Sequence, residues 1–457
     1  MLFDDTICAT ATAQGTGALG IIRVSGKDAF AIVNAVFKGK DLPSQSSHTV
    51  HYGFIENPKT NETIDEVMVS VFRAPKTFTA EDLVEISCHG SSYIQQNIIS
   101  LLLQNGARLA TAGEFTQRAF LNGRIDLAQA EAVADLIAAE NKASHDVALN
   151  QMRGGISNEL QILREKLIEF TSLIELELDF SEEDVAFANR KELENLIQNL
   201  KDKIQNLIQS FDYGNALKNG VPVAIIGKPN AGKSSLLNKL LKEERAIVSD
   251  IAGTTRDVIE EMLVLDGIAF RFIDTAGLRE TEDTIEAIGV ERAKEKVKQA
   301  KIVIHLYEND IDLLQELQPL LAGKIVFNLL SKTDVNNRFD EQHKQQLLQS
   351  YPDYFHFGIS TQNNSNIENL KEQLVASIRG NASPQDIIIT NARHKEALEH
   401  ALQEVEQVSY GMKNGLPGDL LAFHLRDVLY HLGTITGKID VDTDILGTIF
   451  GKFCIGK

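Results

Sequence analysis

The sequence lacks the features of a secreted, disulfide-bonded or membrane-spanning protein. Its 457 residues include three cysteines, and no two of them have the spacing of a disulfide or zinc motif. No apolar run is long enough to span a bilayer, and residues 1–6 do not form a basic segment followed by an apolar core. We therefore expect a cytoplasmic protein in a reducing compartment, with no signal peptide and no membrane segment.

Positive charge is also scarce. Lysine and arginine number 45 against 64 aspartates and glutamates, which gives a formal net charge of −19. Phosphate contacts dominate nucleic-acid affinity, so this balance argues against a chain that clamps nucleic acid unaided, although it leaves room for a local basic patch. The length predicts about two to four domains.

The most informative segment present is a phosphate-binding loop. Residues 227–234 read Gly-Lys-Pro-Asn-Ala-Gly-Lys-Ser, after the apolar run 221–226 and before a helical pattern. This is the G-x-x-x-x-G-K-S motif, whose backbone N–H groups surround phosphate oxygens at a helix N-terminus. Lys233 is expected to reach the β and γ phosphates, and Ser234 to bind Mg²⁺. A chance glycine-rich turn is the alternative, but the strand–loop–helix context favours a nucleoside triphosphate site.

Downstream loops indicate that the nucleotide is GTP. Residues 274–277, Asp-Thr-Ala-Gly, end an apolar strand where the aspartate can hold Mg²⁺ through water. A switch-like loop at residues 253–257 carries Thr255, which is placed to complete the Mg²⁺ shell. Asp266 and Gly267 mark the hairpin between the flanking strands.

Two further loops are predicted to contact the base. Residues 331–334, Ser-Lys-Thr-Asp, resemble the guanine-reading N-K-x-D motif, with serine in place of asparagine. Asp334 still discriminates guanine from adenine, because a carboxylate facing the wrong base edge would be left unpaired. Ser360 and Thr361 resemble the last base-contacting loop.

The predicted GTP-binding residues lie on these loops. They are Asn230, Ala231, Gly232, Lys233, Ser234, Ser235, Ser249, Asp250, Ile251, Ala252, Gly253, Thr254, Thr255, Asp274, Thr275, Ala276, Gly277, Ser331, Lys332, Asp334, Ser360 and Thr361. Ser234 and Thr255 are the expected Mg²⁺ ligands.

Residue patterns divide the chain into four segments. Residues 1–119 mix β-rich and helical runs and predict an α+β domain. Residues 120–216 and 382–457 are dominated by helical patterns, including apolar stripes at spacings of three and four. Residues 217–381 form the predicted Ras-like α/β GTPase domain, entered through a linker near Tyr213. We therefore expect a multidomain protein with a P-loop GTPase domain inserted in a long-helix bundle domain.

Several motifs together resemble one family. The phosphate loop, the switch at residues 250–257 (Asp-Ile-Ala-Gly-Thr-Thr-Arg-Asp) and the tail 453–457 (Phe-Cys-Ile-Gly-Lys) are similar to those of the MnmE (TrmE) family of tRNA modification GTPases. The stretches 5–9 and 113–132 match that family as well, and the resemblance covers the whole chain.

This resemblance implies a function. The family, with an FAD- and NADH-dependent partner, MnmG (GidA), adds an aminomethyl or carboxymethylaminomethyl group to C5 of the wobble uridine, U34, of certain tRNAs. The one-carbon unit comes from 5-formyl- or 5,10-methylene-tetrahydrofolate bound by the N-terminal domain. That domain also forms the homodimer, and the two proteins form a heterotetramer.

The resemblance also implies a folate site. Its contacts fall on Arg23, Glu81, Arg124 and Lys457, which suit a pterin edge and a glutamate tail chemically. The family often has lysine where Arg124 stands. Cys454 lies four residues from the C-terminus between two lysines, which allows a lowered thiol pKa and a catalytic role. Without the resemblance, Arg23 and Glu81 would be ordinary surface charges and Cys454 a small buried apolar residue.

The resemblance extends to hydrolysis. Leu278 stands where many GTPases carry a water-orienting glutamine, and the family assigns that role to a glutamate that maps onto Glu286. Glu282 and Asp283 are neighbouring carboxylates that the residues alone do not distinguish from it.

The resemblance also implies a K⁺ ion in place of an arginine finger. Its expected ligands are Asn230, Ser249, Ile251 and Thr254, and the ion would add positive charge between the β and γ phosphates.

Two other classes of function fit a GTPase of this kind. One is a regulatory switch, like the ribosome-assembly GTPases, which needs neither folate nor the Cys-Ile-Gly-Lys tail. The other is a scaffold that only dimerises a redox partner, against which Asn230 and Glu286 argue.

Overall fold

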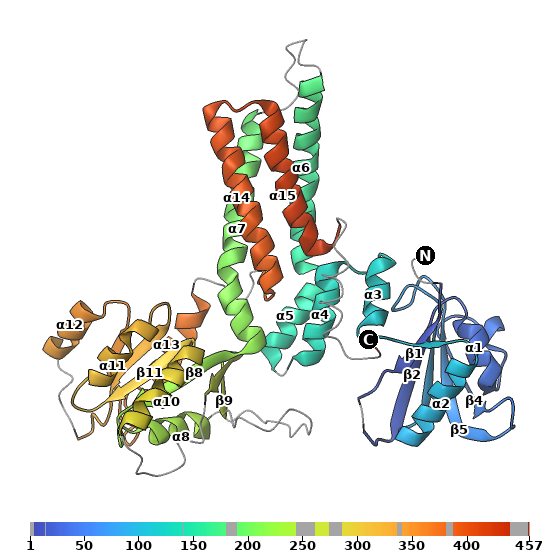
Figure 1. The fold of residues 1–457 in the computed structure, drawn as a ribbon, viewed down its shortest axis with the longest axis horizontal. Helices are drawn as coiled ribbons and strands as arrows, with labels where there is room; N and C mark the ends of the chain where they lie inside the picture. Colours follow the sequence, from blue (N-terminus) through green and yellow to red (C-terminus); the bar gives the residue numbers. More distant parts are fainter. Residues whose placement is uncertain are drawn as a thin grey trace. The chain divides into compact units, whose positions relative to one another are not determined.

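The computed structural model describes most of the chain. The described residues are 4–13, 15–139, 141–179, 190–243, 261–273, 286–335, 341–380, 387–438 and 456. They fall into two compact units (Figure 1). Unit 1 comprises residues 1–138, 148–202 and 397–457, and unit 2 comprises residues 139–147 and 203–396. The interruption of unit 1 by unit 2 agrees with an inserted domain, while the four-segment division stays a prediction.

A mixed sheet forms the N-terminal part of unit 1. Its order is β3-β4-β5-β6-β2-β1-β7, antiparallel throughout except for β1 and β7. The strands are β1 Ile7–Thr10, β2 Leu19–Ser25, β3 Phe37–Lys38, β4 Thr49–Glu56, β5 Thr63–Phe72, β6 Leu83–His89 and β7 Arg108–Leu109. Helices α1 (Ala29–Val36) and α2 (Ser92–Gln104) pack on one face through alternate strand residues such as Val67, Val69 and Val71. The predicted α+β character of this segment is confirmed.

Long helices form the rest of unit 1. They are α3 Glu114–Leu121, α4 Leu127–Ala138, α5 Lys142–Met152, α6 Gly155–Asp179, α7 Arg190–Asn219, α14 Ala392–Asn414 and α15 Gly418–Thr436, of which α5, α7 and α14 each continue into unit 2. Helices α6, α7, α14 and α15 lie side by side (Figure 1). Their predicted stripes are buried, for example at Ile156, Leu160 and Leu200. No described helix is long and apolar enough to cross a membrane.

The linker predicted near Tyr213 is wrong. Helix α7 continues through this position to Asn219, and Tyr213 and Ala216 are buried. Gly214 lies against another segment of the chain, since a Cβ at this position would come within 2.2 Å of the Ile389 carbonyl oxygen. The glycine that suggested a linker therefore permits close packing of a helix.

A six-stranded sheet forms the core of unit 2. Its order is β13-β12-β11-β8-β10-β9, parallel except for β9. The strands are β8 Val221–Gly227, β9 Glu261–Leu265, β10 Ile268–Phe272, β11 Ile302–Tyr307, β12 Ile325–Leu330 and β13 Phe355–Gly358. The helices are α8 Lys233–Glu243, α10 Glu286–Gln299, α11 Asp312–Leu317, α12 Glu341–Ser350 and α13 Ile367–Arg379.

Helices cover both faces of this sheet, as expected for an α/β GTPase domain. Helices α8 and α13 pack on one face, and α10 and α11 pack on the other. The turn between β9 and β10 has Asp266 and Gly267 at φ 48° and 82°, which confirms the predicted hairpin.

Candidate functional site

The phosphate loop joins β8 to α8. Strand β8 lies between β11 and β10, at the point where successive connections leave in opposite directions, which is where open α/β sheets bind ligands. Gly227, Asn230 and Gly232 have φ values of 154°, 62° and 93°. A Cβ at Gly227 would come within 2.4 Å of the Leu306 carbonyl oxygen, so only glycine lets the loop pass the end of β11.

Lys233 lies folded over this loop. Its Nζ donates hydrogen bonds to the carbonyl oxygens of Gly227 at 2.9 Å and Lys228 at 2.8 Å. Burial lowers the pKa of Lys233, and the nearby charge of Lys296 adds to this effect. Ser234 and Ser235 follow on the first turn of α8 and are exposed. The loop therefore presents a cation and two hydroxyl groups at a helix N-terminus, the arrangement that suits a polyphosphate.

The structure brings the two predicted base loops together. The Ser360 hydroxyl donates to Asp334 Oδ1 at 2.6 Å, and the Thr333 N–H donates to the Ile359 carbonyl at 3.2 Å. Thr361 follows and is half-buried. Asp334 is thus oriented at the same carboxyl-end edge of the sheet as the phosphate loop.

Ser331 contacts β11. Its N–H and its hydroxyl both donate to the Tyr307 carbonyl, at 2.8 and 3.2 Å, and the residue is buried. The next residue, Lys332, forms an ion pair with Glu308 at 2.6 Å. Both contacts attach the first base loop to the end of β11.

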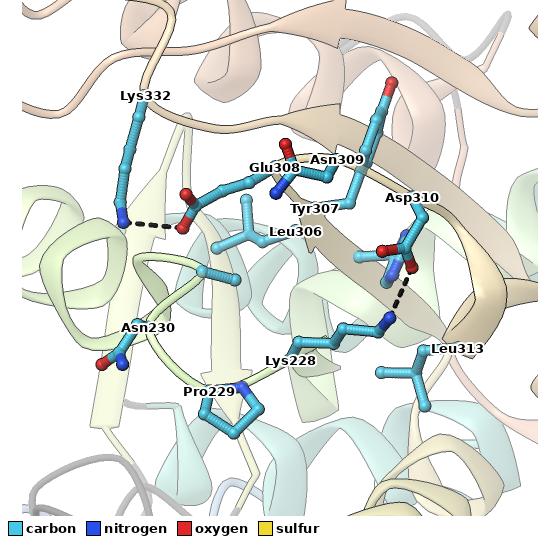
Figure 2. A pocket seen from close by; sticks show the side chains of 12 residues that line it. Lys228, Pro229, Asn230, Leu306, Tyr307, Glu308, Asn309, Asp310, Leu313 and Lys332 are labelled. Atoms are coloured by element: carbon cyan, nitrogen blue, oxygen red, sulfur yellow. Dashed lines mark hydrogen bonds and ion pairs between the residues drawn. The ribbon is translucent and has the colours of Figure 1, made fainter. Parts of the chain in front are cut away.

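A cavity of about 250 Å³ adjoins the phosphate loop (Figure 2). It is lined by the loop and by the end of β11, and ion pairs Lys228–Asp310, at 2.6 Å, and Lys332–Glu308 lie along its walls. His305 also lines it, and burial lowers the pKa of this imidazole to about 4 despite its hydrogen bond to Asn328. His305 is therefore neutral near pH 7.

Many predicted site residues lie outside the described part of the chain. These are Ser249, Asp250, Ile251, Ala252, Gly253, Thr254, Thr255, Asp274, Thr275, Ala276, Gly277, Cys454 and Lys457. Glu286 is the first residue of α10, but its side chain also lies outside the description. The roles predicted for all of them stay predictions.

A second group of predicted residues meets in unit 1. Arg23 on β2 donates through Nε and Nη2 to Glu85 Oε1, at 2.9 and 2.8 Å. Its Nη1 donates to the Gly456 carbonyl at 3.3 Å. Gly456 in turn lies against the end of β1, since a Cβ there would come within 2.2 Å of the Thr10 carbonyl oxygen. Residue 456 therefore lies beside both Arg23 and the end of β1.

The ring of Phe78 contacts two predicted site residues. The guanidinium carbons of Arg23 and Arg124 are 5.3 and 5.5 Å from the centre of its ring, within the range of cation–π contacts. Sequence reasoning missed Phe78. The available signal was an isolated aromatic residue in an otherwise polar loop, three positions before Glu81. We call Arg23, Phe78, Glu81, Arg124 and Gly456 the N-terminal site.

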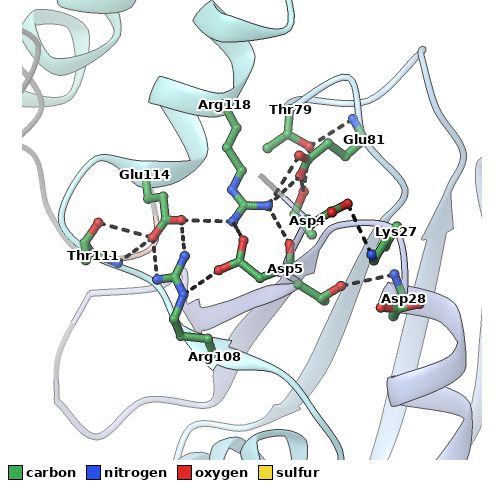
Figure 3. Close-up of polar contacts among 12 residues, drawn as sticks. Asp4, Asp5, Lys27, Asp28, Thr79, Glu81, Arg108, Thr111, Glu114 and Arg118 are labelled. Carbon is green, nitrogen blue, oxygen red and sulfur yellow. Dashed lines mark hydrogen bonds and ion pairs between the residues drawn. The ribbon is translucent and has the colours of Figure 1, made fainter. Parts of the chain in front are cut away.

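Glu81 also belongs to this site, although it is buried, with 8% of its surface exposed. Its carboxylate accepts a hydrogen bond from Ser25 Oγ at 2.8 Å and contacts Arg118 Nη1 at 3.3 Å through both oxygens. Arg118 is fully buried; Figure 3 shows its contacts with Glu81. Sequence reasoning also missed this residue, because charged side chains are rarely fully buried and the only signal was its place in the stretch 113–132.

Comparisons with known proteins cover the whole chain. The family model for the GTP-binding protein TrmE N-terminus matches residues 6–124, and the model for the MnmE helical domain matches residues 127–454. The tRNA modification GTPase MnmE of Cytophaga hutchinsonii is 53% identical over 99% of this chain and 98% of its own length. That of Flavobacterium johnsoniae is 49% identical over 100% of both chains.

One solved structure is also similar to part of the chain. It is a crystal structure of the G domain of the T. maritima FeoB iron transporter, 24% identical, which covers 34% of this chain and 96% of that one. Its TM-score of 0.25 is too low to support an argument.

Proposed function

Because the chain belongs to the MnmE (TrmE) family of tRNA modification GTPases, we propose that it hydrolyses GTP in the modification of the wobble uridine of tRNA. It is a GTP-hydrolysing enzyme of tRNA modification. The observation that carries the nucleotide assignment is the meeting of the phosphate loop and the Asp334–Ser360 pair at one edge of a parallel sheet.

The nucleotide is held at both of its ends in this proposal. Lys233 and the start of α8 bind the β and γ phosphates, and Asp334 accepts hydrogen bonds from the N–H groups of guanine. Ser360 fixes the orientation of Asp334 before the base arrives. Preorganised groups of this kind need no rearrangement when the ligand binds.

Mg²⁺ and K⁺ suit the oxygen-rich residues of the loops. Ser234 and Thr255 would hold Mg²⁺, and Asn230, Ser249, Ile251 and Thr254 would hold K⁺. Asn230 is exposed and has a left-handed φ of 62°. When bound, the two cations supply positive charge at the phosphates. Glu286 would then orient the attacking water.

The cation assignment has a direct test. We expect faster GTP hydrolysis in KCl than in NaCl at equal ionic strength, with the difference lost in Asn230→Ala. Equal rates of the parent protein in the two salts would remove the K⁺ site from the proposal and leave the nucleotide assignment intact.

The N-terminal site is proposed to bind the one-carbon donor, a 5-formyl- or 5,10-methylene-tetrahydrofolate. Arg23, Arg124 and Lys457 would pair with its carboxylates, and Glu81 would accept from the pterin N–H edge. Gly456 lies between Cys454 and Lys457 in the sequence, and its contact with Arg23 supports the idea that these two residues act here.

We also propose the protein's binding partners and its cellular location. The protein would act in the cytoplasm as a homodimer, with the FAD- and NADH-dependent MnmG and with tRNA. The alternative is a regulatory GTPase switch without folate chemistry.

Mass spectrometry of tRNA nucleosides from a strain that lacks this protein tests its proposed role in wobble-uridine modification. We expect the carboxymethylaminomethyl or aminomethyl group to be missing from wobble uridines and restored by the parent gene. Unchanged wobble uridines would favour the regulatory switch.

A further inference from the structure

Arg118 lies at the centre of a buried ionic cluster beside the N-terminal site. It is fully buried on α3, although long charged side chains seldom are. Its Nη2 contacts Asp5 Oδ1 at 2.7 Å and Glu114 Oε1 at 3.0 Å, and its Nη1 donates to the Asp5 carbonyl at 2.9 Å and contacts Glu81 at 3.3 Å (Figure 3). One guanidinium therefore joins the start of the chain, α3 and Glu81.

A second arginine, Arg108, contacts two of the three carboxylates in this cluster. Arg108 contacts Glu114 at 2.6 Å and Asp5 at 2.7 Å, and its side chain is 43% exposed. Hydrogen bonding to Arg108 lowers the pKa of Asp5. Glu81, by contrast, receives its guanidinium contact from Arg118. The two arginines thus share Asp5 and Glu114 and differ at Glu81.

Further contacts hold the loop that carries Glu81 to the residue that follows α3 and to β2. The Asn122 side-chain amide donates to the Thr79 carbonyl at 2.8 Å, and Thr79 Oγ1 is hydrogen-bonded to Ser25 Oγ at 2.7 Å. The same loop carries Phe78, whose ring contacts Arg23 and Arg124. The position of the loop, residues 77–81, therefore depends on both the C-terminal end of α3 and β2.

We propose that Arg118 is a positioning residue of the N-terminal site, which fixes the orientation of the Glu81 carboxylate and holds loop 77–81 against α3. The inference rests on the proposed function, in which Glu81 accepts hydrogen bonds from a pterin. A carboxylate has about four acceptor positions, so the bonds to Ser25 and Arg118 leave capacity for a ligand. Removal of the guanidinium would leave Glu81 buried without its cation and free to turn.

The test measures binding of 5-formyl-tetrahydrofolate to the full-length protein by isothermal titration calorimetry. The variants are Arg118→Met, Arg118→Lys, Glu81→Gln and the double variant Arg118→Met/Glu81→Gln. Arg108→Met is the matched control, because it weakens the same cluster at Asp5 and Glu114 without touching Glu81. The melting temperature and the GTP hydrolysis rate are measured for each variant.

We expect Arg118→Met to weaken folate binding on the order of tenfold or more, since it removes a charge-assisted contact to the binding carboxylate. Arg118→Lys should recover part of this loss, because it keeps the charge but not the planar fork. Arg108→Met should lower the melting temperature, but its affinity for folate should stay within about twofold of that of the parent. The double variant should bind no more weakly than Glu81→Gln alone, because Arg118 acts through Glu81 and has no further effect once that carboxylate is gone.

Two results would overturn the proposal, and they are distinguishable. If Arg118→Met and Arg108→Met lose folate affinity in proportion to their loss of melting temperature, Arg118 only stabilises the fold. If Glu81→Gln binds folate as the parent does, Glu81 is not a ligand and the failure lies in the proposed function. An unfolded Arg118→Met is replaced by Arg118→Lys in the same comparison with Arg108→Met.

Discussion

The phosphate loop is formed by eight consecutive residues, 227–234, and its shape depends on backbone conformations at Gly227, Asn230 and Gly232. The N-terminal site is assembled differently, from β2, loop 77–81, the segment after α3 and residue 456. Its contacts are made mainly by charged and aromatic side chains. A single local motif therefore specifies the first site, whereas the second exists only when distant segments meet.

This difference predicts separable functions. Substitutions in the nucleotide site should affect GTP turnover and leave folate binding intact, and substitutions in the N-terminal site should do the reverse. The two functions are not separable if one side-chain change disables both GTP turnover and folate binding in a folded protein.

The largest effect is expected from Cys454→Ser. Serine is nearly the same size as cysteine but stays protonated near neutral pH, so the variant removes a potential thiolate with little change in packing. Wobble-uridine modification should be lost in a deletion strain that carries this variant, while GTP hydrolysis and dimerisation survive. Normal modification would show that the thiol is structural, and loss of both activities would show that the tail supports the fold.

Glu286→Ala should lower GTP turnover on the order of a hundredfold, because a group that positions the attacking water commonly contributes that much. The affinity for GTP should stay near that of the parent, since the side chain acts on water. Single-turnover rates and nucleotide titrations measure the two effects. Glu282→Ala and Asp283→Ala are the matched controls and should be mild, and a larger loss in either one would move the catalytic role to that residue.

Asp334→Asn should shift the preference from GTP towards XTP by on the order of tenfold or more, because the amide presents a donor where guanine requires an acceptor. Competition binding with the two nucleotides measures the shift. Binding of 5-formyl-tetrahydrofolate serves as the control and should not change. An unaltered preference would exclude residues 331–334 as the base-reading loop.

As the pH falls, unit 2 should lose stability before the ionic cluster around Arg118 does. The pKa of His305 falls to about 4 in the folded protein because the ring is buried, so stability is complete above the unfolded pKa of about 6.5 and declines as the pH falls towards 4. Burial raises the pKa of Glu114, but hydrogen bonds from Arg108, Thr111 and Arg118 outweigh it and the net shift is downward. Glu114 therefore contributes stability that is lost only as the pH falls below the ordinary carboxyl range.

Hydrogen exchange followed by mass spectrometry separates the two units in this experiment. Peptides of β11 and β12 should lose protection between about pH 6.5 and 4, and the loss should be smaller in His305→Gln. Peptides of α3 should keep their protection over the same range. Equal loss in both sets of peptides would mean that the two units unfold as one.

The local patterns of the sequence were sufficient for much of the fold. The β-rich and helical runs of residues 1–119 indicated an α+β domain, apolar spacings of three and four indicated the long helices, and the phosphate loop was found with its strand and helix. These features repeat over a few residues, so the chain encodes them without reference to distant partners.

Other features depend on contacts between distant residues, and the sequence left them open or suggested the wrong answer. Gly214 indicated a linker, yet it packs a continuous helix against Ile389, 175 residues later in the chain. The buried charge of Arg118 is tolerable because the carboxylates of Asp5, Glu81 and Glu114 pair with it.

The sequence by itself determined the nucleotide-binding chemistry, because eight consecutive residues specify the backbone conformation of that site. Only the tertiary structure brought Gly456 to Arg23, placed Phe78 in contact with two arginines and joined Ser331 to Tyr307. The reason is physical: each of these contacts depends on which surfaces the folded segments present to one another, and no local periodicity encodes that information.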